Sequence, residues 1–220
     1  MSKIKLPHAS GNSMSIAAPA TNPASDLELK LPATVGTAGQ VLKNSSTAGT
    51  LEFGSAGKIL QVQNTTVTAT ATLSCISSWE DSSVTCSLTP ASSDSKILIS
   101  ISATGEGNAT NQQRFDFRIK KAISGGATTY LTGAAAGSRT PATGVTGDKT
   151  ENATTSPSSF SLSNYLDSPS TTSAVTYTLQ VTYELASASG TYYLNRNVSD
   201  SDASGTPRFV SWITLMEVSG

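Results

Sequence analysis

An acidic loop near the C-terminus is the first stretch whose residues could do chemistry. Asp200, Asp202 and Ser204 place side-chain oxygens at alternate positions, and Gly205 follows them. Calcium loops use such a spacing because the hard cation prefers oxygen ligands. The bidentate carboxylate that should complete the site is missing, since Ser211 stands in its place. An ordinary loop explains the same residue types, so these three residues are only a weak calcium candidate.

Scattered carboxylates raise the possibility of a glycosidase, in which two acidic side chains act as acid and base. The candidates are Glu106, Asp116, Asp148, Asp167 and Glu184. A carbohydrate cleft usually also needs aromatic platforms, and aromatic residues make up only 6% of the chain. Most of these carboxylates fall on strand faces that the pattern predicts to be solvated. We therefore expect no catalytic residues, no cofactor and no enzyme activity.

The sulfur and imidazole groups are too few for other chemistry. The only histidine, His8, lies in the N-terminal segment, which excludes a histidine-dependent triad or a multi-histidine metal site. The two cysteines, Cys75 and Cys86, flank an expected turn. They could face each other across a hairpin and form a disulfide, or remain reduced as small buried side chains.

Trp79 is a possible surface contact. It lies in a stretch that reads as a turn, and exposed aromatic residues on loops are good contact anchors. The alternative, which is the commoner outcome for an indole in such a turn, is that it folds back over the rim of the core.

The composition favours strands over helices. Ser and Thr supply 67 of the 220 residues, whereas charged residues make up only 13% and the net charge is −1. Thr, Val, Ile and Tyr suit half-buried pleated surfaces. No basic patch is present to neutralise phosphates, so we expect no nucleic-acid partner. No apolar run approaches the length of a membrane span, so we also expect no membrane insertion.

Residues 1–57 differ from the rest of the chain. The stretch Ser13–Thr21 is echoed by Asp26–Thr34, and both end in Pro-Ala-Thr. We expect short strands that gain stability by stacking or by pairing with the same segment of other chains. A flexible tether is the alternative.

Residues 58–220 contain longer strands separated by turns. Phe115, Phe117 and Ile119 alternate with charged residues, which predicts one buried and one wet face. Similar signals fall at 59–73, 84–88, 96–102, 114–120, 128–131, 158–163, 176–184, 191–195 and 209–218. These strands predict an antiparallel β-sandwich that resembles a jelly roll. The long loop 133–157 should lie at a subunit interface or on an exposed tip.

Two stretches resemble a known family. The segment from Asn12 to Gly54, with its Pro-Ala-Thr repeats, Gly39-Gln-Val-Leu-Lys43 and Leu51-Glu-Phe-Gly54, resembles the collar-like repeat of phage tail-fibre and appendage proteins, especially those of cyanophages. The remainder looks like the terminal domain that often follows this repeat. It is carried by Gly57–Gln61, Ser95–Ile99, Ala136–Arg139, Leu166–Pro169, Tyr177–Val181, Leu194–Arg196 and Ile213–Glu217.

The resemblance implies a structural protein of the virion, made in the host cytoplasm and released by lysis. The missing shaft is unlike long tail fibres and favours a short fibre, a head fibre or a capsid-decorating knob. We expect a homotrimer in which residues 1–57 attach to another virion protein and residues 58–220 form a knob for contact with host surface glycans. A decoration protein that stabilises the particle is the alternative, and a glycan depolymerase is a third.

Overall fold

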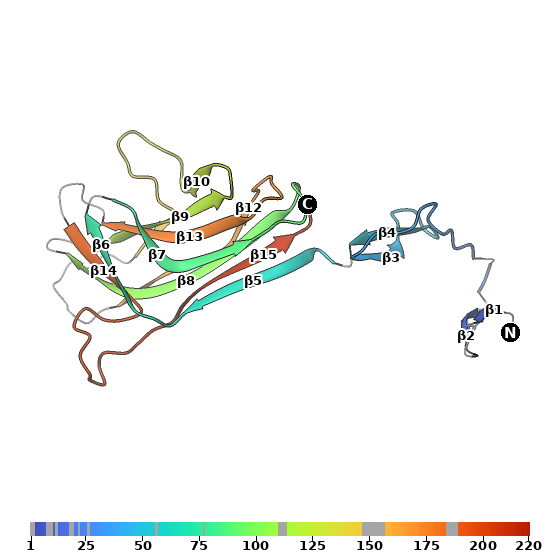
Figure 1. Ribbon diagram of the computed structural model, residues 1–220, viewed down its shortest axis with the longest axis horizontal. Helices are drawn as coiled ribbons and strands as arrows, with labels where there is room; N and C mark the ends of the chain where they lie inside the picture. Colours follow the sequence, from blue (N-terminus) through green and yellow to red (C-terminus); the bar gives the residue numbers. More distant parts are fainter. Residues whose placement is uncertain are drawn as a thin grey trace. The chain divides into compact units, whose positions relative to one another are not determined.

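A computed structural model of the chain describes residues 3–7, 11, 13–17, 20–21, 23–25, 27–55, 57–76, 78–109, 114–146, 157–183 and 189–220 (Figure 1). His8, Asp148, Glu184 and most of the second half of the predicted 133–157 loop lie outside these residues. The chain divides into two compact units, Met1–Ala56 and Gly57–Gly220. We describe each unit by itself.

The first unit consists of short antiparallel pairs. Strands β1 (Lys3–Pro7) and β2 (Ser13–Ala17) form one hairpin, and β3 (Gln40–Asn44) and β4 (Leu51–Ser55) form another. A single parallel bridge joins Lys30 to Thr50 beside the second hairpin. Four apolar side chains around this bridge stay exposed to between 62% and 91%: Leu27, Leu29, Leu31 and Val35. Such a row leaves apolar surface that a partner can cover.

The second unit is a sandwich of two antiparallel sheets (Figure 1). The five-stranded sheet contains β7 (Glu80–Leu88), β9 (Phe115–Ile123), β10 (Thr128–Leu131), β11 (Gly144–Val145) and β13 (Val175–Tyr183). The six-stranded sheet contains β5 (Ile59–Val67), β6 (Ala71–Ile76), β8 (Lys96–Ala109), β12 (Ser158–Asp167), β14 (Ser189–Leu194) and β15 (Ser211–Val218). The described residues contain no helix. The prediction of an all-β antiparallel sandwich is confirmed.

The core lies between the sheets and follows the period of two. Ile97, Ile99 and Ile101 of β8 are fully buried, as are Ile213 and Leu215 of β15. On β9 the same alternation buries the aromatic and aliphatic residues that the sequence pattern places on one face. Successive side chains of a strand point to opposite faces, so each strand contributes every second residue to the core.

Aromatic rings fill the centre of this core. Phe117 stacks on Phe160 with ring centroids 4.9 Å apart, and Tyr192 packs edge-on against Phe117 at 5.4 Å. Phe115 lies 5.3 Å from Tyr183 and 5.5 Å from Tyr192. These rings come from both sheets and therefore connect the two layers through offset and edge contacts, which aromatic pairs prefer.

An ionic contact also connects the layers. Lys121 Nζ on β9 lies 3.0 Å from Asp167 Oδ1 on β12, and both side chains are nearly buried. The hydroxyl of Tyr177 donates to the second carboxylate oxygen of Asp167 at 2.7 Å. Burial and the neighbouring Asp167 carboxylate raise the pKa of Tyr177, so the phenol stays protonated and remains a donor.

The expected strands lie close to those of the structure, with several corrections. The strands expected at 96–102 and 158–163 continue to Ala109 in β8 and to Asp167 in β12, and the expected loop 133–157 contains β11. The run 59–73 forms two strands rather than one, since β5 ends at Val67 and β6 begins at Ala71. The turn expected between Cys75 and Cys86 does not extend over Glu80–Ser83 as the pattern suggested, because these residues begin β7. A register shift opposite Thr178 and Gln180 absorbs the extra residues of β7 there.

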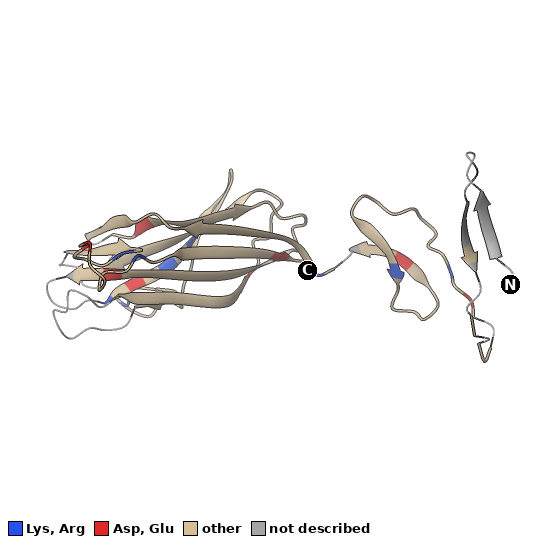
Figure 2. Cartoon of the chain, turned by 90° about the horizontal axis from the view of Figure 1, so that it is seen from below, with Lys and Arg blue, Asp and Glu red and all other residues tan. Residues whose placement is uncertain are grey.

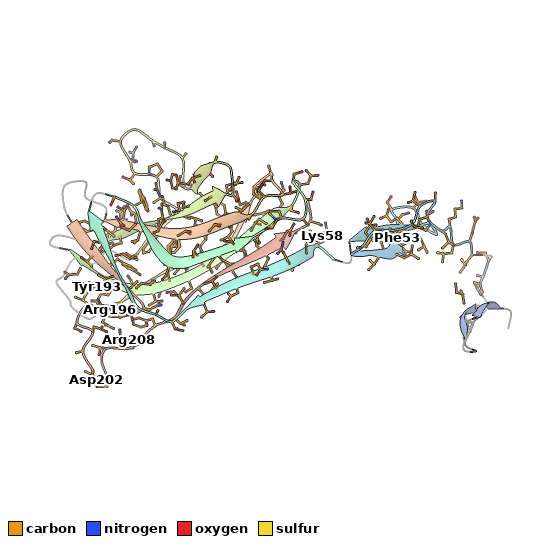
Figure 3. All side chains as sticks on the ribbon, in the orientation of Figure 1. Phe53, Lys58, Tyr193, Arg196, Asp202 and Arg208 are labelled. Atoms are coloured by element: carbon orange, nitrogen blue, oxygen red, sulfur yellow. The ribbon has the colours of Figure 1, made fainter. Side chains whose placement is uncertain are left out.

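The sandwich has two distinct ends. The chain enters this unit at Lys58, close to the C-terminus, and the loop containing Arg196 and Asp202 lies at the opposite end (Figures 1 and 3). Within the described residues, no helix is long and apolar enough to span a membrane.

Candidate functional site

Charged, amide and aromatic side chains that could bind a ligand gather on the outer face of the five-stranded sheet. Along β9 and just before it, Arg114, Asp116, Arg118 and Lys120 point away from the core, because Phe115, Phe117 and Ile119 point into it. We refer to this surface as the β9 face. Figure 2 shows Lys, Arg, Asp and Glu residues as blue and red bands on several parts of the sandwich.

A guanidinium held between two aromatic rings forms the centre of the β9 face. The Arg118 Cζ lies 4.3 Å from the centroid of the Trp79 ring and 3.6 Å from that of Tyr130. Trp79 precedes β7 and Tyr130 lies on β10, so three separate segments build this arrangement. Cation–π contacts of this kind fix both rings against the charge. Partial burial lowers the pKa of Arg118, whereas Tyr130 and Asp81 oppose the shift, and the side chain stays charged.

A polar network continues from Arg118 across the sheet. Arg118 Nε donates to Gln180 Oε1 at 2.6 Å, and Gln180 Nε2 donates to Asp81 Oδ1 at 2.7 Å. Lys120 Nζ contacts the second oxygen of Asp81. Partial burial works to raise the pKa of Asp81, but the hydrogen bonds from Lys120 and Gln180 outweigh it and hold that pKa below its usual value. The carboxylate is therefore charged at neutral pH.

A polar pocket lies at the start of the same strand. Its volume is about 380 Å³, and it is lined by Arg114, Asp116, Ser138, Arg139 and Thr140. Arg114 Nη2 lies 3.3 Å from Asp116 Oδ1, and the Asp116 side chain is only 5% exposed. The loop between β10 and β11 supplies the other three residues. The pocket thus has a fixed wall on β9 and a second wall from that loop.

Paired hydroxyl groups cover the part of this sheet beyond the network. Thr85 and Thr178 lie 2.8 Å apart through their hydroxyls, and Ser87 and Thr176 lie 2.7 Å apart. Each pair joins β7 to β13 directly opposite one another. Cross-strand pairs of this kind add to sheet stability. They leave a neutral surface next to the charged β9 face.

The two cysteines are free and buried. Cys75 lies on β6, which pairs with β14, whereas Cys86 lies on β7, which pairs with β13. The idea that they face each other across a hairpin is therefore wrong, because β6 and β7 belong to different sheets. Burial, with a smaller effect of Glu80, raises the pKa of Cys75 to about 12. A thiol with such a pKa is a poor nucleophile near neutral pH.

The weak calcium candidate, Asp200, Asp202 and Ser204, belongs to the loop at the end of the sandwich opposite Lys58, where Figure 3 labels Asp202. Arg196 Nη1 lies 3.8 Å from an Asp200 oxygen, and Arg208 contacts the other oxygen. Two guanidinium groups therefore stand where a cation would have to approach Asp200. Asp202 and Ser204 are exposed. Among the residues that the structure describes, no group of three or more His, Cys, Asp and Glu side chains could hold a metal.

Three predicted surface carboxylates are buried, which corrects the sequence interpretation. Asp116 contacts Arg114, and Asp167 contacts Lys121 and Tyr177. Glu106 accepts a hydrogen bond from the Val198 amide at 3.0 Å. Loops cover Asp116 and Glu106, and a register shift within β12 precedes Asp167. The alternation of apolar and polar residues along a strand predicts neither loop contacts nor register shifts.

Sequence reasoning placed Arg118 and Lys120 on a wet face and Trp79 near the surface, but it did not connect them. It also missed Tyr130, Gln180 and Arg139. Tyr130 lies opposite Lys120 in the register of β10 and β9, and Gln180 lies opposite Arg118 in that of β13 and β9. Only the strand order brings these side chains together, because Trp79, Arg118 and Gln180 are far apart in the sequence.

Comparison with known proteins adds no family assignment. The chain matches no protein-family model, and no curated protein matches its sequence. Aromatic rings beside planar amide, carboxylate and guanidinium groups suit sugars, because rings cover their apolar faces and the polar groups bond their hydroxyls.

Proposed function

We propose that this chain is a non-enzymatic subunit of a phage virion, a fibre or spike whose C-terminal sandwich is displayed for contact with host surface glycans. The resemblance of residues 12–54 to collar-like repeats supports the virion assignment. The observation that carries the glycan contact is Arg118 held between Trp79 and Tyr130. Tyr130 is 45% exposed, so it remains able to meet a ligand.

The surface suits weak and repeated contacts rather than one tight site. The pocket and the aromatic pair lie on a strand face and not in a deep cleft. Weak contacts gain strength when several identical sites act together. A homotrimer attached through residues 1–57 to another virion protein would supply this multiplicity. The exposed row Leu27, Leu29, Leu31 and Val35 supports burial of that segment against a partner.

Binding to an array of bacterial surface polysaccharides tests the glycan contact. We expect the full chain to bind, and Tyr130→Ala to lose most of the signal, because it removes an exposed half of the aromatic pair. Leu166→Ala is the matched control, since Leu166 is 56% exposed on β12 in the other sheet. Equal loss in both variants, or no loss in Tyr130→Ala, would exclude the β9 face as the contact surface.

A decoration protein that stabilises the particle is the second candidate. The same exposed apolar row favours it, because a shell lattice would cover that row as well as an attachment site would. The array separates the two functions: a chain that binds no polysaccharide but binds isolated capsids is a decoration protein.

A further inference from the structure

The pocket at the start of β9 has features of a small-ligand site that the aromatic pair lacks. Its volume of about 380 Å³ falls within the range of small-molecule pockets, about 300 to 1,000 Å³. Its walls contain two arginines from different segments and one carboxylate. Asp116 is nearly buried and contacts Arg114, whose side chain is 39% exposed. A charged group is therefore built into the floor of the pocket.

The loop that completes the pocket is fastened to β9. The Thr143 amide donates to the Phe117 carbonyl at 2.7 Å, and the Thr143 hydroxyl accepts from the Ile119 amide at 3.2 Å. The Gly133 amide donates to the Ala142 carbonyl at 2.9 Å, which closes the base of the loop. These bonds fix the loop to the strand that carries Asp116. A fixed wall reduces the ordering cost of binding.

A turn within this loop holds Arg139. Its amide and its Nη1 atom both donate to the Ala136 carbonyl, at 3.3 and 3.2 Å. Gly137 has φ of 63°, a conformation that favours glycine. One guanidinium nitrogen of Arg139 is thus already bonded to the turn. The other N–H groups of the guanidinium remain as donors for a ligand. Ser138 and Thr140, on either side, add hydroxyls to the same wall.

The charges of the lining select the ligand. Asp116 already contacts Arg114, and Arg139 presents a second guanidinium to the pocket, which a single negative charge on a ligand can meet. The guanidinium fork matches the planar geometry of a carboxylate through two parallel hydrogen bonds. Asp116 and the hydroxyls of Ser138 and Thr140 can bond sugar hydroxyl groups. The aromatic pair lies next along the strand, because Asp116 and Arg118 are two residues apart, or about 7 Å.

We infer that this pocket binds a uronic-acid residue, a sugar with one carboxylate, and that the aromatic pair contacts the adjoining sugar of the same chain. This inference rests on the proposed function and deepens it, since it names the class of glycan. Arg139 pairs with the carboxylate, Arg114 and Asp116 form the polar floor, and the hydroxyls of the loop bind the ring hydroxyls.

Two small ligands that differ at one group test the inference directly. Titration calorimetry of the full chain with methyl β-D-glucuronide and methyl β-D-glucoside compares a carboxylate with a hydroxymethyl group. We expect the glucuronide to bind at least about tenfold more tightly, the range expected for one charge-assisted hydrogen bond. Arg139→Gln should remove this preference. Because Arg139 is exposed, the variant should fold as the parent does.

Arg208→Gln is the matched control, since it removes the same charge from an exposed loop residue outside the pocket. Equal binding of the two sugars, no binding of the glucuronide, or an equal loss in both variants would overturn the inference. Tighter binding of methyl glucoside 6-sulfate than of the glucuronide would also overturn it, in favour of sulfated sugars. Polysaccharide binding on the array tests the proposed function separately, because neutral polymers can still bind the aromatic pair.

Discussion

Among single residues, the glycines of the inner sheet faces decide where the aromatic rings fit. A Cβ atom added to Gly107 on β8 would lie 2.1 Å from Cε2 of Phe115. Phe115 is itself fully buried and packs against Tyr183 and Tyr192, so its ring has little room to move. The small residue and the large one therefore form a single packing unit across the core.

Gly107→Ala should destabilise the sandwich by about 1–3 kcal/mol, the usual cost of overpacking a core. Urea unfolding measures this change. Gly205→Ala is the control, because an added Cβ meets nothing within 4 Å in the exposed loop. The interpretation fails if the two variants are equally stable, since that would mean that Phe115 moves freely.

Glu217 should make stability depend on acid pH. This carboxylate is fully buried on β15 and accepts hydrogen bonds of 2.6 Å from the Ala91 amide and from Gln61 Nε2. Burial works to raise the pKa of Glu217, but Ser95, Gln61 and the Ala91 amide together lower it below the ordinary value of 4.5. The stabilisation is therefore present above about pH 4.5 and is lost as the pH falls through the lowered pKa of the folded state.

Glu217→Gln should lower the free energy of unfolding at pH 7 by about 1–3 kcal/mol, because the two bonds reach different carboxylate oxygens and one of them becomes an NH2 donor. The difference from the parent should shrink at pH 3, because the unfolded parent binds a proton at Glu217 below about pH 4.5. Urea titrations at the two pH values provide the measurement, with the exposed Asp202→Asn as control. A difference that does not change with pH would contradict the assignment.

Residue patterns predicted burial better than they predicted polar contacts. The alternation along 114–120 and 96–102 placed the core side chains on the correct faces, because the period of two is a property of the strand itself. The burial of Asp116, Asp167 and Glu106 depends on loops and on a register shift, which no local pattern encodes. The same limit hid the polar pocket, whose second wall is a loop.

Between elements, the ion pair of Lys121 and Asp167 connects β9 of one sheet to β12 of the other. A buried charge is costly to leave without its partner, and removal of one partner typically costs about 3–5 kcal/mol. Lys121→Met should therefore destabilise the sandwich strongly, because Asp167 would keep only the bond from Tyr177.

The double variant Lys121→Met with Asp167→Asn should recover most of this loss, since no unpaired charge stays buried and the amide oxygen can still accept from Tyr177. Thermal unfolding of the two single variants and the double variant gives the coupling free energy between the two side chains. Additive losses would show that the pair contributes nothing beyond its packing.

The order of elements was the part that the sequence could not supply. Strands were expected at most of the correct positions, but Cys75 and Cys86 seemed to share a hairpin because they are close in sequence. Consecutive strands β6 and β7 instead join different sheets. The pairing of β10 and β13 with β9 likewise places Tyr130 and Gln180 beside Arg118. Non-local pairing of this kind builds the site.

For the whole molecule, the two units should respond differently to truncation. The buried hydrophobic core of the described residues lies entirely between Val67 and Leu215, within Gly57–Gly220. This unit should therefore fold alone, with a melting temperature close to that of the full chain. The exposed row Leu27, Leu29, Leu31 and Val35 lies in Met1–Ala56 and leaves apolar surface that other chains can cover.

Light scattering tests the consequence for assembly. We expect the full chain to have three times its mass of 22.5 kDa, as the proposed trimer requires, and the 57–220 fragment to be monomeric. A fragment that remains trimeric would place the subunit contacts on the sandwich. A monomeric full chain would contradict the trimer.

The paired hydroxyls on the five-stranded sheet also bear on how the sandwich responds to dissolved salt. Thr85 with Thr178 and Ser87 with Thr176 join strands without any charge, and the Lys121–Asp167 ion pair between the sheets is nearly buried. Dissolved ions screen charges but leave such contacts largely unchanged. The stability of the sandwich should therefore be similar at low and at high salinity. Changes of salinity should act mainly on the affinity of the charged β9 face for its ligands.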